Sequence, residues 1–318
     1  MATQTISDIT SILAKQRDFF ESNQSRDIDF RIEQLIKLKK AIKANENNIY
    51  EALSADFKKS QFETYATEIG VLYEEISCML KNIKKWATPQ LVTDTIANFP
   101  SRNYIYNDPY GVCLIIGAWN YPLSLTLAPV IGAIAAGNTC IIKPPRASIH
   151  AYRIIQKIIA DNFNENYLTV LDEYSDNNEM LSHRYDYIFF TGSVEVGRTI
   201  AKAAAEFLTP TTLELGGKSP CIIDKQADIV VAAKRVAWGK FLNGGQTCIA
   251  PDYLLLHHDV KEKFYTAFKN SLKEFYGNNP QDSADYPRII NDRHFNRLAA
   301  LIKDGEIIVG GQTDADTR

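Results

Sequence analysis

The feature that most constrains the fold is a repeated pattern that begins at Gly111. Short, continuously apolar runs alternate with longer segments that have helical spacing. Strands that are apolar on both faces are typical of a parallel sheet with helices on each side. The pattern therefore predicts an α/β fold. The expected strands are Val112–Ile116, Thr139–Lys143, Leu168–Leu171 and Tyr187–Phe190, and the expected helices are about 124–136, 147–160 and 194–206.

The segments on either side of this pattern have a different texture. Residues from about 5 to 86 carry apolar side chains at helical spacing, which predicts an all-helical start. Two β-prone pieces flank a turn-like segment within 89–107, and this predicts a protruding hairpin arm. A second run of strands and helices begins near Thr211. We therefore expect a first domain from 1–88 and 108–210, the arm at 89–107, and a second domain at 211–318.

Composition excludes several classes of protein. The chain has 318 residues, of which 45% are hydrophobic and 23% charged, so it is long enough for about two globular domains. A net charge of -3 gives no electrostatic reason to expect a nucleic acid or an anionic membrane as partner. The longest apolar stretch, 127–137, is too short to span a bilayer, and the N-terminus has no secretory pattern. We expect a cytoplasmic protein.

Five cysteines are present, and one of them stands apart. Cys248 follows the Gly244-Gly245 pair in Asn-Gly-Gly-Gln-Thr-Cys, which predicts an accessible turn where a thiolate could meet a ligand. From this residue alone, a nucleophile and a packing role both remain open. No paired Cys-x-x-Cys is present, so neither a disulfide framework nor a metal site is predicted. The other four cysteines lie in apolar runs and are expected to be buried core thiols: Cys78, Cys113, Cys140 and Cys221.

Polar residues follow the expected strands at places where α/β sheets gather ligands. Asn120 and Lys143 each come at or just past a strand end, although a turn asparagine and a solvated lysine are the simpler alternatives. The segment from Gly192 to Gly197 opens a helix directly after a strand, a placement that favours a phosphate, although the pattern taken alone fits a plain strand-to-helix turn better. Glu214 stands between two leucines, where it is either a general base or an outward-facing strand residue.

Taken together, these segments resemble the aldehyde dehydrogenase superfamily. The matching stretches occur in the family's order, and the glutamate and cysteine motifs lie 34 positions apart (248 minus 214). The resemblance implies a Rossmann-like cofactor domain with a parallel sheet, an α/β catalytic domain and a hairpin arm. The short N-terminal segment and the Cys248-Ile-Ala-Pro-Asp-Tyr run are similar to the class 3 branch, which implies a fatty or aromatic aldehyde as substrate. The stretches are Gly117–Pro122, Ile142–Pro144, Phe190–Gly197, Leu213–Pro220 and Gly244–Cys248.

The resemblance implies roles for individual residues. Cys248 would attack the aldehyde carbon, since a thiolate is a strong nucleophile near neutral pH. The Asn120 amide and the Cys248 N–H would bind the oxyanion, and Glu214 would activate the water that hydrolyses the resulting thioester. NAD or NADP is the implied cofactor, with no metal. The implied cofactor-binding residues are Trp119, Lys143, Arg146, Gly192, Ser193, Gly197 and Leu215.

Two departures from the family pattern matter. Pro145-Arg146 replaces the Ser-Glu that often follows the lysine, and a cation there suits the 2′-phosphate of NADP. The chain also stops at Arg318, directly after a Gly-Gly turn, so we expect an incomplete catalytic domain that lacks the later cofactor-contacting glutamate and the oligomerisation strand. A homodimer is implied for the full-length protein. Two rival functions stay open: a nucleotide-independent cysteine esterase, and a catalytically silent fragment that binds nucleotide.

Overall fold

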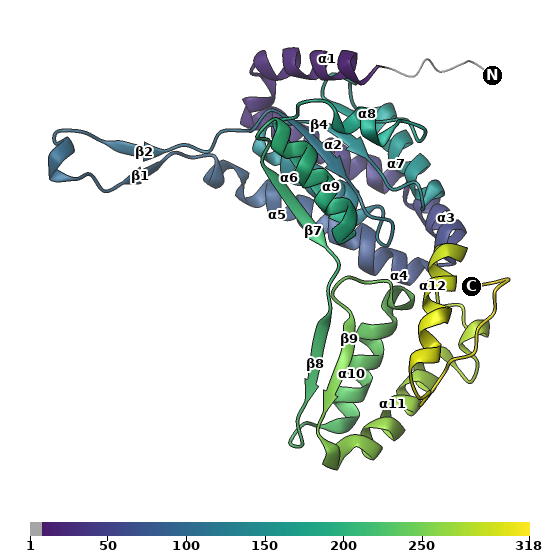
Figure 1. Ribbon diagram of the computed structural model, residues 1–318. Coiled ribbons are helices and arrows are strands. Elements are labelled where there is room, and N and C mark those ends of the chain that lie inside the picture. Colours follow the sequence, from purple (N-terminus) through teal and green to yellow (C-terminus); the bar gives the residue numbers. More distant parts are fainter. Residues whose placement is uncertain (1–7) are drawn as a thin grey trace, which may run out of the picture. The chain divides into compact units, whose positions relative to one another are not determined.

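The computed structural model describes residues 8–318, which form two compact units (Figure 1). The first unit comprises residues 8–46, 68–145 and 152–214, and the second comprises residues 47–67, 146–151 and 215–318. The division into a cofactor domain and a catalytic domain stays a prediction. Residues 5–7, where the helical start was expected, lie outside the described residues.

A five-stranded sheet forms the centre of the first unit (Figure 1). The pairs β3–β4, β3–β6 and β4–β5 are all parallel, as the continuously apolar strands predict. The structure also places β7 in this sheet, next to β6, although the sequence analysis assigned that segment to the second domain. In spatial order the strands are β5 (Leu168–Val170), β4 (Thr139–Lys143), β3 (Val112–Ile116), β6 (Tyr187–Gly192) and β7 (Thr211–Leu215).

Helices connect and cover these strands. Helix α6 (Ser124–Ala136) joins β3 to β4 and packs on α2, α5 and both strands, so its apolar side chains are buried almost all round. It ends at Gly137, whose φ of +90° gives a left-handed cap that favours glycine. The remaining helices with residues in this unit are α1 (Ile9–Glu21), α2 (Ile28–Ala44), α5 (Gly70–Trp86), α7 (Ile149–Asn162), α8 (Asn177–Leu181) and α9 (Val194–Glu206).

The segment between α5 and β3 forms the expected hairpin. Strands β1 (Gln90–Val92) and β2 (Asn103–Ile105) are antiparallel, and Leu91 lies opposite Tyr104. A short 3₁₀ turn, Ile96–Asn98, lies between them. Several large apolar side chains of this hairpin are exposed.

The second unit contains a smaller parallel sheet. Strands β8 (Ser219–Ile223) and β9 (Pro251–Leu256) are joined by α10 (Ile229–Phe241), which makes a β–α–β crossover. Helix α11 (Lys261–Tyr276) packs against α10. The buried centre of the second unit is formed by Ile223, Ala233, Val236 and Phe264. The other helices are α3 (Glu46–Phe57), α4 (Gln61–Thr64), the one-turn π-helix Tyr65–Ile69 that leads into the first unit, and α12 (Asp292–Leu301).

Across residues 8–318, no helix combines the length and the apolar composition that crossing a bilayer requires.

The expectation of four buried core thiols is wrong for Cys78, which is exposed. Helix α5 buries Leu72, Ile76 and Ile83, and Cys78 is two residues, or about 200°, away from Ile76 around the helix. Cys113 and Cys140 are buried, and Cys221 is half-buried.

Candidate active site

The predicted cofactor residues of the first unit lie at one edge of its sheet. Ile116, the last residue of β3, pairs with Lys143 on one side and with Phe190 on the other. Because these strands are parallel, the loops after β3, β4 and β6 all leave from the carboxyl edge. The chain runs from β3 to β4 on one side and later returns to β6 on the other, which makes β3–β6 the switch point where such sheets bind ligands.

The loop after β3 carries Trp119 and Asn120, both half-buried. Its start is fixed by Gly117, whose N–H donates to the Lys143 carbonyl (3.1 Å). A Cβ at Gly117 would lie 2.0 Å from Oγ1 of Thr126, so only glycine fits there. Asn120 is therefore held between a strand end and the start of α6, as the sequence predicts.

The end of this loop is held by Glu68, a residue that the sequence analysis did not select. Its carboxylate is fully buried and accepts the N–H groups of Leu123 (2.8 Å) and Ser124 (3.1 Å) at the start of α6. A carboxylate at this position satisfies unpaired N–H groups of the first turn and complements the helix dipole. Glu68 thus fixes the backbone only three residues after Asn120.

Lys143 is not a solvated surface lysine. Its side chain is buried, Nζ donates to the carbonyl of Asp172 (2.7 Å), and it lies 5.5 Å from the centre of the Tyr152 ring. Tyr152 is itself anchored by its hydroxyl, which donates to the Leu171 carbonyl (2.6 Å). A buried cation is costly unless it is well solvated by dipoles or paired with a charge. The Lys143 Nζ is therefore held at a fixed position on the carboxyl edge.

The turn after β6 has the geometry of a helix start open to solvent. Ser193 is the N-cap of α9, and its Oγ accepts the N–H of Val196 (3.3 Å). A Cβ at Gly192 would lie 2.5 Å from the Phe190 ring, and Gly197 is buried one turn into the helix. Ser193 and the first-turn side chains are exposed, so the positive end of the helix dipole faces solvent.

The loop of the second unit that carries Cys248 has unusual backbone geometry. Three consecutive residues before it have positive φ: Asn243 (+56°), Gly244 (+63°) and Gly245 (+79°). The two glycines adopt this conformation without cost, whereas Asn243 needs support from its surroundings. Cys248 follows in a turn just before β9, and its side chain is exposed. The structure therefore presents Cys248 on a constrained, accessible turn, as the sequence predicts.

Gln246 stabilises this loop through both ends of its amide. Its Nε2 donates to the carbonyls of Asn243 (2.9 Å) and Arg288 (3.1 Å), and its Oε1 accepts the N–H of Ile290 (3.0 Å). The Asn243 side chain in turn donates to the Gln246 carbonyl (3.2 Å). Two side-chain amides thus replace the regular hydrogen bonds that this loop lacks.

The glutamate motif approaches the same loop within the second unit. A Cβ at Gly217 would lie 2.7 Å from the Cys248 carbonyl oxygen, so glycine allows the two backbones to touch. Glu214 stands three residues before Gly217 and is exposed at the end of β7, and Leu215 is half-buried. Arg146 is exposed in the loop that precedes α7.

The buried thiols behave differently from an accessible one. Burial raises the pKa of the Cys113 thiol to about 12, with a smaller contribution from the charge of Asp186. Burial also raises the pKa of Cys140. Both thiols therefore stay protonated at neutral pH and are poor nucleophiles.

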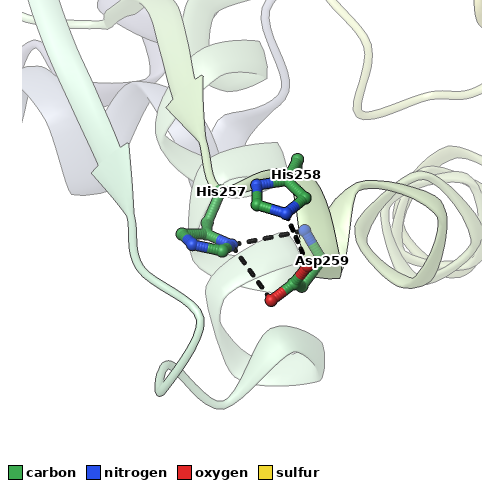
Figure 2. Close-up of side chains that lie close together, drawn as sticks. All are labelled: His257, His258 and Asp259. Atoms are coloured by element: carbon green, nitrogen blue, oxygen red, sulfur yellow. Dashed lines mark hydrogen bonds and ion pairs between the residues drawn. The ribbon is translucent and has the colours of Figure 1, made fainter.

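One group of potential metal ligands occurs among residues 8–318. Figure 2 shows His257, His258 and Asp259 turned toward one another. His257 Nδ1 accepts the Asp259 N–H (3.2 Å), and His258 Nε2 lies 2.8 Å from an Asp259 carboxylate oxygen. These contacts join consecutive residues of the turn before α11. The turn follows the end of β9, whereas the Cys248 loop precedes its start, so this group is not part of the candidate site.

Residues 1–317 match the Aldehyde dehydrogenase family. The chain belongs to this family. The resemblance inferred from the motifs is therefore confirmed, and so is the aldehyde dehydrogenase-like α/β fold.

Individual relatives support the same assignment. The chain is 47% identical over 303 residues to the 4,4'-diaponeurosporen-aldehyde dehydrogenase of Staphylococcus aureus, covering 94% of this chain and 66% of that protein. It is 42% identical over 314 residues to the protein of Rattus norvegicus named aldehyde dehydrogenase, dimeric NADP-preferring, covering 98% and 69%. A substrate-bound structure of Staphylococcus aureus AldH has a TM-score of 0.94 at 45% identity, covering 98% of this chain and 68% of that chain. The chain thus spans about two thirds of the length of these family members.

Proposed function

We propose that this chain carries out the family's reaction, the oxidation of an aldehyde to a carboxylic acid with NAD or NADP. The observation that carries the proposal is Cys248, which is exposed on a constrained turn in a chain that matches the family over residues 1–317. In this proposal residues 211–318 act as the catalytic domain and the sheet of the first unit binds the cofactor.

The proposed chemistry begins at Cys248. Its thiolate attacks the aldehyde carbon and forms a thiohemiacetal, whose oxyanion accepts hydrogen bonds from the Asn120 side-chain amide and the Cys248 N–H. Removing one such donor typically costs about 100- to 1000-fold in rate. The intermediate is then oxidised to a thioester on Cys248. Glu214 takes a proton from the water that hydrolyses this thioester, and the acid is released with Cys248 regenerated.

The carboxyl edge of the first sheet fits a dinucleotide. The buried Lys143 provides a fixed cation, and the Ser193-capped start of α9 directs a positive dipole to solvent, which suits hydroxyl and phosphate groups. Trp119, Gly192, Gly197 and Leu215 complete the proposed cofactor-binding set. When bound, the nicotinamide supplies the hydride acceptor.

The proposed cofactor preference rests on Arg146. An exposed guanidinium can pair with a 2′-phosphate, and the relative from Rattus norvegicus is named NADP-preferring. Replacing Arg146 with Glu should shift the ratio of kcat/KM values toward NAD by about 10-fold or more, because a carboxylate repels the phosphate and accepts from ribose hydroxyls. An unchanged ratio would refute this assignment.

The proposed substrate is a fatty or aromatic aldehyde, as the class 3 features imply. The relative from Staphylococcus aureus is named for a 4,4'-diaponeurosporen-aldehyde. A cytoplasmic location is also proposed. A homodimer is a further proposal, and the relative from Rattus norvegicus is named dimeric.

A single-turnover assay tests the proposed function. The chain is mixed with hexanal or benzaldehyde and NADP or NAD, and reduced nicotinamide is followed by absorbance. We expect a burst of about one equivalent per chain, lost in Cys248→Ser and retained in Glu214→Gln, which should stop before further turnovers. A folded wild-type chain that gives no burst contradicts the proposal.

Ester cleavage, nucleotide reduction and acylation of Cys248 together distinguish the rival functions. A cysteine esterase would cleave p-nitrophenyl acetate without reducing nucleotide in the presence of aldehyde. A silent fragment would bind nucleotide and never acylate Cys248.

A further inference from the structure

Glu63 connects α4 to the loop that carries Cys248, although the two are far apart in sequence. Its carboxylate is buried, and Oε1 accepts the backbone N–H of Asn243 at 2.5 Å across 180 residues of chain. Asn243 is itself fully buried. Charge-assisted hydrogen bonds of this kind are about twice as strong as neutral ones, and they matter most where water is excluded.

The local structure explains how Glu63 is directed at this loop. Ser60 caps the start of α4, and its Oγ accepts the Glu63 N–H (3.2 Å). Ser60-x-x-Glu63 is the signature of a helix start, which fixes the backbone of Glu63 at the third position of the helix. The Glu63 carbonyl accepts the Thr67 hydroxyl (2.7 Å) within the following π-helix. The residue is therefore fixed on both sides before it contacts Asn243.

The contact stabilises the strained position of the loop. Asn243 has a φ of +56°. For a residue other than glycine this left-handed conformation costs free energy, and it persists only where surrounding contacts hold it. Asn243 also exchanges side-chain and backbone hydrogen bonds with Gln246, two residues before Cys248. A chain of short contacts thus runs from Glu63 through Asn243 and Gln246 toward the proposed nucleophile.

The Glu63 carboxylate also affects the neighbouring side chain of Tyr276. Burial raises the pKa of Tyr276 to about 12, and the negative charge of Glu63 contributes to this rise.

We propose that Glu63 is a positioning residue that holds Asn243 in its left-handed conformation and thereby sets the place of the Cys248 thiol and N–H. The inference rests on the proposed function of Cys248 as a nucleophile, but not on the use of a nucleotide. Its predicted effect is on the rate of attack by Cys248, with little effect on how an acyl donor binds.

The test follows acylation of Cys248 by p-nitrophenyl acetate in single turnovers of the whole chain without nucleotide. In Glu63→Ala we expect the limiting rate constant to fall about 10- to 100-fold, because a small misplacement of a reacting group costs this much, with an unchanged half-saturating concentration. In Glu63→Gln the amide oxygen still accepts the Asn243 N–H, so the rate should recover to within about 3-fold of wild type. Glu51→Ala, which removes an exposed glutamate of α3, is the matched control.

Two outcomes would overturn the inference. One is a Glu63→Ala chain that unfolds at the wild-type midpoint and is acylated at the wild-type rate. The other is a Glu63→Gln chain that loses as much rate as Glu63→Ala, because the hydrogen-bond acceptor would then not be the cause. Failure of the oxidoreductase proposal is seen separately, as a wild-type chain that is acylated by the ester and reduces no nicotinamide with an aldehyde.

Discussion

Two regions of this protein hold cysteines in opposite ways. Cys113 and Cys140 lie opposite each other on β3 and β4, where the sheet excludes water and burial raises the pKa of each thiol. Cys248 lies on a turn between α10 and β9, where left-handed residues and side-chain amides replace regular secondary structure, and it is exposed. The same side chain is inert packing in the sheet and accessible in the loop. Backbone setting, and not residue type, decides which thiols can react.

The largest expected effect is a difference in alkylation rate. In the native chain, iodoacetamide should modify Cys248 at least about 1000-fold faster than Cys113 or Cys140, because the buried thiols react only after the sheet opens. Peptide mass spectrometry over time measures each rate, and Cys78, which is exposed, should also react quickly. In denaturant all the rates should converge. Equal native rates for Cys113 and Cys248 would break the comparison.

The second effect concerns the close approach of Gly217 to the Cys248 loop. Gly217→Ala places a Cβ 2.7 Å from the Cys248 carbonyl oxygen, so the turn must move. We expect acylation of Cys248 by p-nitrophenyl acetate to slow about 100-fold. Gly216→Ala is the matched control, because a Cβ there meets nothing within 4 Å. If both variants react at the same rate, the backbone contact does not position Cys248.

The sheet edge should show a smaller effect, on stability. Gly117→Ala brings a Cβ within 2.0 Å of Thr126 Oγ1 and should lower the free energy of unfolding by about 2 kcal/mol. Gly132→Ala lies inside α6 with open space around it and should raise stability by up to about 1 kcal/mol. Urea unfolding curves measure both. A Gly117→Ala chain as stable as wild type would show that the loop after β3 is loosely packed.

The smallest expected effect is a pH dependence from the buried thiols. The reference pKa of a cysteine is 9.0, whereas Cys113 is raised to about 12 by burial. Below pH 9 both the folded and unfolded chains are protonated at this residue. As pH rises from 9 toward 12, the unfolded chain releases a proton that the folded chain keeps, so stability falls by about 1.4 kcal/mol per pH unit. Unfolding of wild type and Cys113→Ala at pH 8, 9 and 10 should show a shallower loss in the variant. If stability falls with pH equally in wild type and in Cys113→Ala, Cys113 is not the source of the pH dependence.

Local patterns were enough to predict most of the fold. The continuously apolar strands and the helix at 194–206 were found where expected, because strand burial and helix periodicity are local properties. The place of β7 in this sheet was not predicted, since its pairing with β6 depends on contacts outside its own sequence. Cys78 was misjudged because apolar neighbours in sequence do not show which face of a helix is buried.

The site was predictable only in part. Motifs pointed to Cys248, Asn120 and Lys143. No local signal reveals that Lys143 is buried and donates a hydrogen bond to a carbonyl 29 residues away. Glu63 is 180 residues from its partner, and only its helix-start signature is visible in the sequence. Side-chain to backbone bonds between distant segments are set by the completed fold.

The central claim is that Cys248 forms the covalent intermediate, and mass spectrometry of the acyl-enzyme tests it most directly. The Glu214→Gln chain is mixed with benzaldehyde and NADP and then quenched in acid. The protein is digested, and its peptides are searched for a benzoyl group. We predict one benzoyl group on the peptide that contains Cys248, in step with one reduced nicotinamide per chain. Reduced nicotinamide with no acyl group on Cys248, or an acyl group on another residue, would contradict the account.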